Sequence, residues 1–151
     1  MKEAGLTRQE RHFINLMKLM TVFFLFIAFV AALFPEWILV YVTRIGIILV
    51  GWPTRLPTFD EEVFWRVLTV SSSLTFGYVC WTTSRDVVRR LAFARVVIVA
   101  KLLSAIGFFI VFFTVERLFV YLVAAIVDAV ITFVIGLAYR AVVTSRPQSF
   151  L

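Results

Sequence analysis

The sequence is poor in the residues that build covalent cross-links, metal centres and haem sites. Its 151 residues include one cysteine, Cys80, and one histidine, His12. A lone cysteine cannot form a disulfide within the chain, and no CxxC pair exists for a dithiol redox centre or a structural zinc site. One histidine cannot supply both axial ligands of a bis-histidine haem. We therefore expect no metal and no cofactor.

Charged residues are also scarce, at 16% of the chain, whereas hydrophobic residues make up 62%. Because a soluble domain is only about 45–50% apolar, this excess predicts a single integral membrane domain over residues 1–151. The net charge of +6 would suggest a nucleic-acid partner in a soluble protein. No basic patch interleaves with aromatic residues outside the apolar runs, so we expect no nucleic acid among the partners.

Four apolar runs predict an all-α, transmembrane four-helix bundle. A hydrocarbon core of ~30 Å needs about 20 helical residues at ~1.5 Å each. The predicted spans cover about residues 13–34, 62–83, 91–114 and 118–141. The first helix begins near Thr7, because Thr7 and Glu10 match a capping box, and it stops at Pro35. Its apolar stretch is longer than a usual signal-peptide core, so we expect it to be retained.

The segment at about residues 37–50 is apolar but short. Fourteen helical residues reach only ~21 Å, and Arg44 and Gly46 interrupt the run. Runs of about 10–14 residues are more often interfacial or re-entrant than spanning. We expect this segment to lie at the outer interface and to pack on the bundle; re-entry into the membrane is the alternative. A turn-rich loop should follow at Gly51–Pro53 and Pro57.

The Lys and Arg residues gather on one side of the predicted bundle. With four spans, the N-terminus, residues 84–95 and the C-terminus share a side, which holds most of the 15 cations. They are Lys2, Arg8, Arg11, Lys18, Arg85, Arg89, Arg90, Arg95, Arg140 and Arg146. The opposite side holds Arg44, Arg55, Arg66 and Arg117. The positive-inside rule then predicts a multi-pass protein of the inner (plasma) membrane with both termini in the cytoplasm.

Two formal charges lie near the middle of the last two spans, Lys101 and Asp128. A charge in hydrocarbon costs roughly 2.5–3.5 kcal/mol by insertion scales, so it usually has a partner or a function. The link between these spans centres near residue 116, and counting from it puts the two residues within ~4–5 Å in depth. We expect an ion pair. It either locks the two helices together or holds a proton, an ion or a polar headgroup; separate partners, including another subunit, are the third possibility.

Small and hydroxyl residues also interrupt the apolar spans. A possible polar pocket near mid-membrane would be lined by Ser72, Thr75, Ser104 and Thr132. The alternative interpretation is helix packing, because small and polar residues let transmembrane helices approach and bond to one another. A four-residue repeat from Ala124 to Gly136, which includes Asp128 and Thr132, favours packing.

A basic cluster follows the second span. It consists of Arg85, Arg89, Arg90 and Arg95. Each cation near an anionic leaflet contributes roughly 1 kcal/mol, so the cluster predicts contact with lipid headgroups; docking of an acidic partner is the alternative.

Short motifs mark the ends of the predicted spans. They are Phe34-Pro35-Glu36-Trp37, Phe64-Trp65-Arg66, Ser84-Arg85-Asp86 and Tyr139-Arg140, with Lys101 and Asp128 between them. In this layout, over about residues 13–141, the chain resembles small bacterial four-helix membrane proteins, loosely the DoxX-like and related uncharacterised group. The resemblance implies a four-helix bundle, sometimes linked to redox or thiol metabolism, and brings no agreed catalytic residues. The absence of a CxxC pair argues against a thiol-redox role here.

The sequence thus predicts a non-catalytic integral membrane protein. Its loops are short, and it shows no nucleophile constellation and no cofactor ligands. We expect a structural or accessory subunit of a larger membrane complex, with membrane lipids and other membrane subunits as partners. The alternative is a small lipid-, quinone- or ion-binding or transport protein that uses Lys101 and Asp128. A membrane enzyme that acts on lipid is a third class.

Overall fold

The computed structural model describes residues 6–51, 62–115 and 117–145, and this part of the chain forms helices and no strands. The helices are α1 (Arg8–Leu33), α2 (Pro35–Val50), α3 (Glu62–Arg85), α4 (Val87–Thr114) and α5 (Phe119–Ser145). The predicted all-α class is confirmed.

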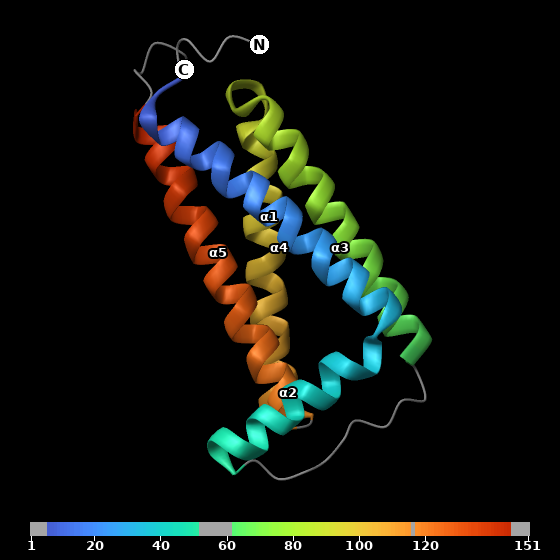
Figure 1. Ribbon diagram of the computed structural model, residues 1–151. Helices are drawn as coiled ribbons and strands as arrows, with labels where there is room; N and C mark the ends of the chain where they lie inside the picture. Colours follow the sequence, from blue (N-terminus) through green and yellow to red (C-terminus); the bar gives the residue numbers. More distant parts are fainter. Residues whose placement is uncertain (1–5, 52–61, 116, 146–151) are drawn as a thin grey trace.

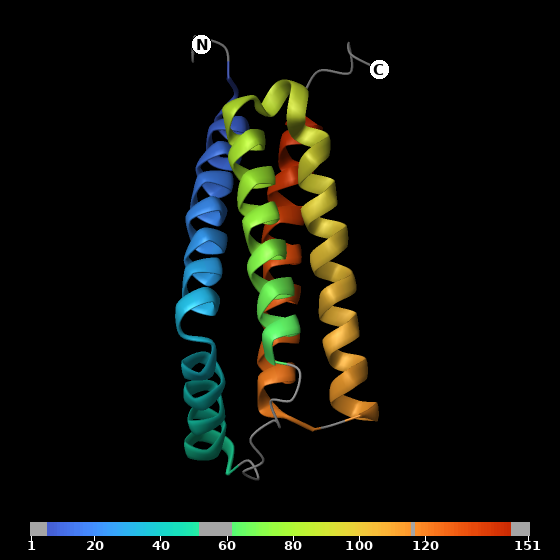
Figure 2. The same ribbon diagram turned by 90° about the vertical axis from the view of Figure 1, so that its right-hand side faces the viewer.

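The four long helices lie side by side, as Figures 1 and 2 show. Helix α1 packs against α3 and α5, and α4 packs against the same two helices. Helices α1 and α4 are therefore diagonal neighbours across the bundle. The start of α1, the α3–α4 connection and the end of α5 lie at one end, and the short helix α2 lies at the other end (Figure 1).

Three helices in the described part of the chain are long and apolar enough to cross a membrane: α1, α4 and α5. They indicate a membrane-embedded protein. Helix α3 is of similar length, with 24 residues. Its hydropathy is lower because the run Ser71-Ser72-Ser73 and several threonines replace apolar side chains near its middle and end.

The surface of the bundle is largely apolar. Phe26, Val67 and Phe133 each expose about 60% or more of their area, at 61%, 62% and 64%. A soluble monomer rarely leaves a contiguous apolar surface of this extent open to water, whereas lipid tails cover such a surface at no cost. The buried core is small by comparison, and it contains Phe13, Met17, Phe24, Cys80, Val87, Leu91, Ala94, Val97, Ile131, Ile135 and Val142.

The ends of α1 follow local rules of helix capping. The Thr7 hydroxyl accepts a hydrogen bond from the Glu10 amide at 3.2 Å, and the Glu10 carboxylate accepts one from the Thr7 amide at 2.9 Å. This is the capping box predicted from the sequence. Helix α1 ends at Leu33 because Pro35 has no amide hydrogen to continue the ladder. The same proline then opens α2, where its fixed φ suits the first helical turn.

The later helices extend up to four residues beyond the predicted spans. Helix α4 begins at Val87, not near residue 91, because the Asp86 carboxylate caps it by accepting a hydrogen bond from the Arg89 amide at 3.2 Å. Asp86 alone separates α3 from α4, so residues 84–95, which hold the basic cluster, are almost entirely helical. Helix α5 continues to Ser145, four residues past its predicted end.

The short segment after the first helix forms α2, and α2 packs against both α1 and α5. At Gly46, which is buried, α2 lies against Phe119 of α5. A Cβ atom at this position would lie 2.6 Å from Cγ and Cδ1 of Phe119. Only glycine therefore lets the α2 backbone lie directly on the first turn of α5.

Some sequence predictions fall outside the described residues. They concern the loop at Trp52, Pro53 and Pro57 and the cations Lys2, Arg55 and Arg146.

Candidate functional site

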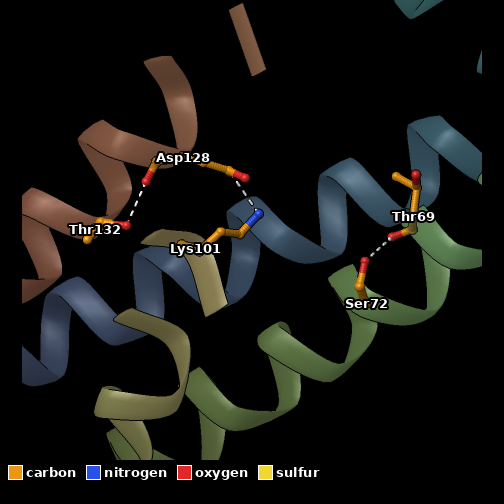
Figure 3. A network of polar contacts seen from close by, with 5 residues as sticks. All are labelled: Thr69, Ser72, Lys101, Asp128 and Thr132. Carbon is orange, nitrogen blue, oxygen red and sulfur yellow. Dashed lines mark hydrogen bonds and ion pairs between the residues drawn. The ribbon is translucent and has the colours of Figure 1, made fainter. Parts of the chain in front are cut away.

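An ion pair joins α4 to α5 in the middle of the bundle. The Nζ of Lys101 donates a hydrogen bond to Oδ1 of Asp128 across 2.8 Å. The two side chains expose only 16% and 9% of their area. Figure 3 shows the lysine reaching from α4 toward the aspartate on α5. The contact that equal depth in the two spans predicts is present in the structure; its role stays a prediction.

Two aromatic rings complete the surroundings of the lysine. Its Nζ lies 5.4 Å from the ring centroid of Phe24 on α1 and 5.2 Å from that of Phe76 on α3. A cation within about 6 Å of a ring face is attracted by the ring quadrupole, by ~2 kcal/mol or more when water is excluded. The two rings also contact each other, with centroids 5.5 Å apart. Residues from all four long helices therefore meet at Lys101.

The sequence analysis missed these two phenylalanines. Phe24 and Phe76 lie in helices whose other residues are mostly apolar. Their residue type therefore does not distinguish them from phenylalanines that face lipid. The sequence does give the depth of each residue in the membrane, counted along its span. Phe24 is near the middle of the first predicted span, and Phe76 is past the middle of the second. Counting depth across all spans, and not only along the α4–α5 hairpin, would have placed both rings close to the level of the charges.

The four residues of the possible polar pocket lie on three helices, α3, α4 and α5. Thr132 lies one turn from Asp128 and donates to the Asp128 backbone carbonyl at 2.8 Å. On α3, Ser72 donates to the Thr69 carbonyl at 3.2 Å and Thr75 to the Ser71 carbonyl at 2.8 Å. These hydroxyls donate to backbone carbonyls of their own helices, and Figure 3 shows the bonds of Thr132 and Ser72. Ser104 is half-buried, one turn after Lys101, and a shared pocket stays a prediction.

The ion pair can do little chemistry because its two charges are buried and already bonded to each other. Breaking a buried pair by removing one partner costs ~3–5 kcal/mol, because the remaining charge is left without compensation. A carboxylate that already accepts a hydrogen bond from a lysine is poorly placed to bind a substrate. Among residues 6–51, 62–115 and 117–145, no group of three His, Cys, Asp or Glu residues is arranged to hold a metal ion.

The basic cluster lies where α3 meets α4, and its members have different surroundings. Arg85 lies over the Trp81 ring at 5.0 Å, and Arg89 is 87% exposed with a weak contact of 3.9 Å to Asp86. Arg90 is exposed. Arg95 instead turns toward α5, where it donates a hydrogen bond to the Tyr139 hydroxyl. Three of the four cations are therefore available to headgroups, and the fourth joins two helices.

Another interhelical contact that the sequence does not reveal lies at the opposite end. The Arg66 guanidinium of α3 donates a hydrogen bond to the Ala32 carbonyl in the last turn of α1. The last four carbonyls of a helix have no partner within the helix, and a cation there also interacts favourably with the helix dipole. Arg66 therefore ties the end of α1 to the start of α3.

The scan against family models gives no match, and the searches of curated proteins and of solved structures return no similar protein. The resemblance to DoxX-like proteins stays a prediction that rests on short motifs. Function is therefore argued from the geometry of this chain.

Proposed function

We propose that the protein is a non-catalytic, four-span membrane protein that serves as a structural or accessory subunit of a larger membrane assembly. The observation that carries the proposal is the closed centre of the bundle. Lys101 and Asp128 neutralise each other at 2.8 Å, and the rings of Phe24 and Phe76 lie against the lysine. In this proposal the two charges hold helices together, and neither is free to bind or activate a substrate.

The fourth crossing in this proposal is α3. It runs alongside α1, α4 and α5 over a similar length (Figure 2). Its polar hydroxyls do not oppose burial in lipid, because those of Ser71, Ser72 and Thr75 donate to carbonyls of the same helix. With four crossings, the basic cluster and the described ends of α1 and α5 share one side, which the positive-inside rule assigns to the cytoplasm.

The case for partner subunits comes from small residues that the chain does not use for its own packing. Among the described residues, a Cβ atom added at Gly107 on α4 or at Gly136 on α5 would meet no atom within 4 Å apart from its chain neighbours and the backbone of its own helix. Glycine in the middle of a helix costs ~1 kcal/mol relative to alanine. Small residues on membrane helices are typical of places where a second helix approaches, so these two positions suit contact with another chain.

Mild extraction of the native membrane tests this proposal. We expect the 17.3 kDa chain to co-purify with other membrane proteins at stoichiometric ratio. Gly107→Leu and Gly136→Leu should reduce the recovered partners at least tenfold, because leucine fills the space that a second helix would occupy. Ile106→Leu and Phe133→Leu, at exposed apolar positions, are the matched controls and should leave the partners in place.

Recovery of the wild type as a lone chain at native expression would contradict the proposal. The alternative, a lipid-, quinone- or ion-binding or transport protein, gives a different result. Lys101→Met and Asp128→Asn would then abolish ligand binding or transport while the chain keeps its oligomeric state.

A further inference from the structure

A shallow hollow on α2 combines an acid, a base and two aromatic rings. Glu36, Trp37, Val40, Tyr41 and Arg44 line it. These positions share one face of the helix, since they are spaced by one, three or four residues. Glu36 and Arg44 stand at its two ends, eight residues or ~12 Å apart along the axis.

The acid and the base of this hollow have no charged partner in the described part of the chain. Neither Glu36 nor Arg44 forms a hydrogen bond or an ion pair there. Both side chains are exposed. Opposite charges held apart on one face of a helix are complementary to a ligand that itself carries a cation and an anion.

The aromatic wall of the hollow is also open. The rings of Phe34 and Trp37 lie 5.5 Å apart and those of Trp37 and Tyr41 lie 5.8 Å apart, which makes a continuous row along α2. Trp37 is 59% exposed and Tyr41 is 53% exposed. Their faces can therefore receive an organic ammonium group, which is attracted to aromatic rings.

The depth of the hollow matches the headgroup layer of a bilayer. The apolar part of α1, from Phe13 to Leu33, spans ~31 Å, which is the thickness of one hydrocarbon core. The residues that follow Leu33 therefore reach the second interface, where Trp and Tyr side chains concentrate. Arg66, which caps the end of α1, lies at the same level.

We propose that this hollow binds the headgroup of a zwitterionic phospholipid with a primary ammonium, of the phosphatidylethanolamine type. Arg44 holds the phosphate, since a guanidinium can donate two parallel hydrogen bonds to phosphate oxygens. Glu36 accepts hydrogen bonds from the ammonium, and the rings of Trp37 and Tyr41 cover its other side. The acyl chains continue along the exposed apolar surface of the bundle next to α2.

This chemistry distinguishes the headgroups. A choline group offers no N–H donor to Glu36, and it retains only the attraction to the rings. A glycerol headgroup carries no cation, and it leaves the net negative lipid facing the Glu36 carboxylate. Phosphatidylethanolamine should therefore bind best of the three.

Native mass spectrometry of the full chain in detergent tests the proposal, with palmitoyl-oleoyl phosphatidylethanolamine, phosphatidylcholine or phosphatidylglycerol added at equal concentration. We expect the wild type to retain phosphatidylethanolamine about fivefold better than the other two lipids, the factor that one charged contact near a membrane surface contributes. Glu36→Gln should abolish this preference, and Glu36→Asp should keep it. Arg44→Gln should lower the retention of all three lipids about fivefold. Arg11→Gln, at an exposed cation of the opposite end that is not part of the basic cluster, should leave the preference unchanged.

Two results would overturn the proposal. One is equal retention of the three lipids by the wild type. The other is a preference for phosphatidylethanolamine that survives Glu36→Gln or that disappears with Arg11→Gln. Because Glu36 and Arg44 are exposed and form no contact with charged residues of the described chain, circular dichroism and melting of these variants should match the wild type.

Discussion

Lys101→Met is expected to destabilise the bundle by ~3–5 kcal/mol, because it leaves the buried carboxylate of Asp128 without its cation. Asp128 either stays charged among apolar side chains or takes up a proton, and both states cost free energy relative to the pair. Reversible unfolding in mixed micelles, followed by circular dichroism, measures this change. Lys18→Met, at an exposed position on α1, is the matched control and should change stability by less than ~0.5 kcal/mol.

Removing the charge of Asp128 should destabilise the bundle less than removing the charge of Lys101. In Asp128→Asn, the Lys101 cation keeps the rings of Phe24 and Phe76, which contribute ~2 kcal/mol or more in a water-free site. The double variant Lys101→Met with Asp128→Leu should return to within ~1 kcal/mol of the wild type, because apolar replacement of a whole buried pair is often neutral. Losses that add up across Lys101→Met, Asp128→Leu and the double variant would show that the two residues are not coupled.

Gly46→Leu is expected to detach α2 from the bundle. Even the first atom of the new side chain would lie 2.6 Å from the Phe119 ring, and overpacking of this kind costs ~1–3 kcal/mol. We expect amide hydrogen exchange over residues 36–50 to accelerate about tenfold or more, while α4 and α5 keep their protection.

Two comparisons isolate the clash as the cause of this effect. Gly136→Leu introduces the same side chain at a position where no described residue outside its own helix lies within 4 Å of the added Cβ atom, so the protection of α2 should not change. Phe119→Ala, combined with Gly46→Leu, should restore much of the protection by removing the obstructing ring. Normal protection of α2 in Gly46→Leu alone would contradict the packing of α2 against α5.

The parts of the fold that follow from local chemistry could be predicted from the sequence. The capping box of Thr7 and Glu10 depends on residues three apart, and the stop at Pro35 depends on one missing hydrogen. The short link around residue 116 fixes the relative depth of Lys101 and Asp128, so their contact followed from counting. Asp86 was the missed local signal: as an N-cap, it starts α4 four residues before the predicted span.

The contacts between distant helices could not be predicted in the same way. A membrane helix is apolar on every side, so its sequence does not mark which face turns inward. The positions of Phe24 and Phe76 around the lysine depend on how α1 and α3 are rotated. The contact of Arg66 with the Ala32 carbonyl and the fit of Gly46 on Phe119 depend likewise on the angles between helices, which no local pattern records.

The central claim is that α1, α3, α4 and α5 all cross the membrane, with the ion pair enclosed between them. Single cysteines in a Cys80→Ala background, labelled from each side of the membrane with an impermeant maleimide, test it most directly. The account predicts that cysteines at Gln9, Arg90 and Thr144 react from one side, and cysteines at Leu49 and Val115 from the other. If α3 does not cross, Gln9 and Thr144 will react from opposite sides, and the four-span bundle is wrong.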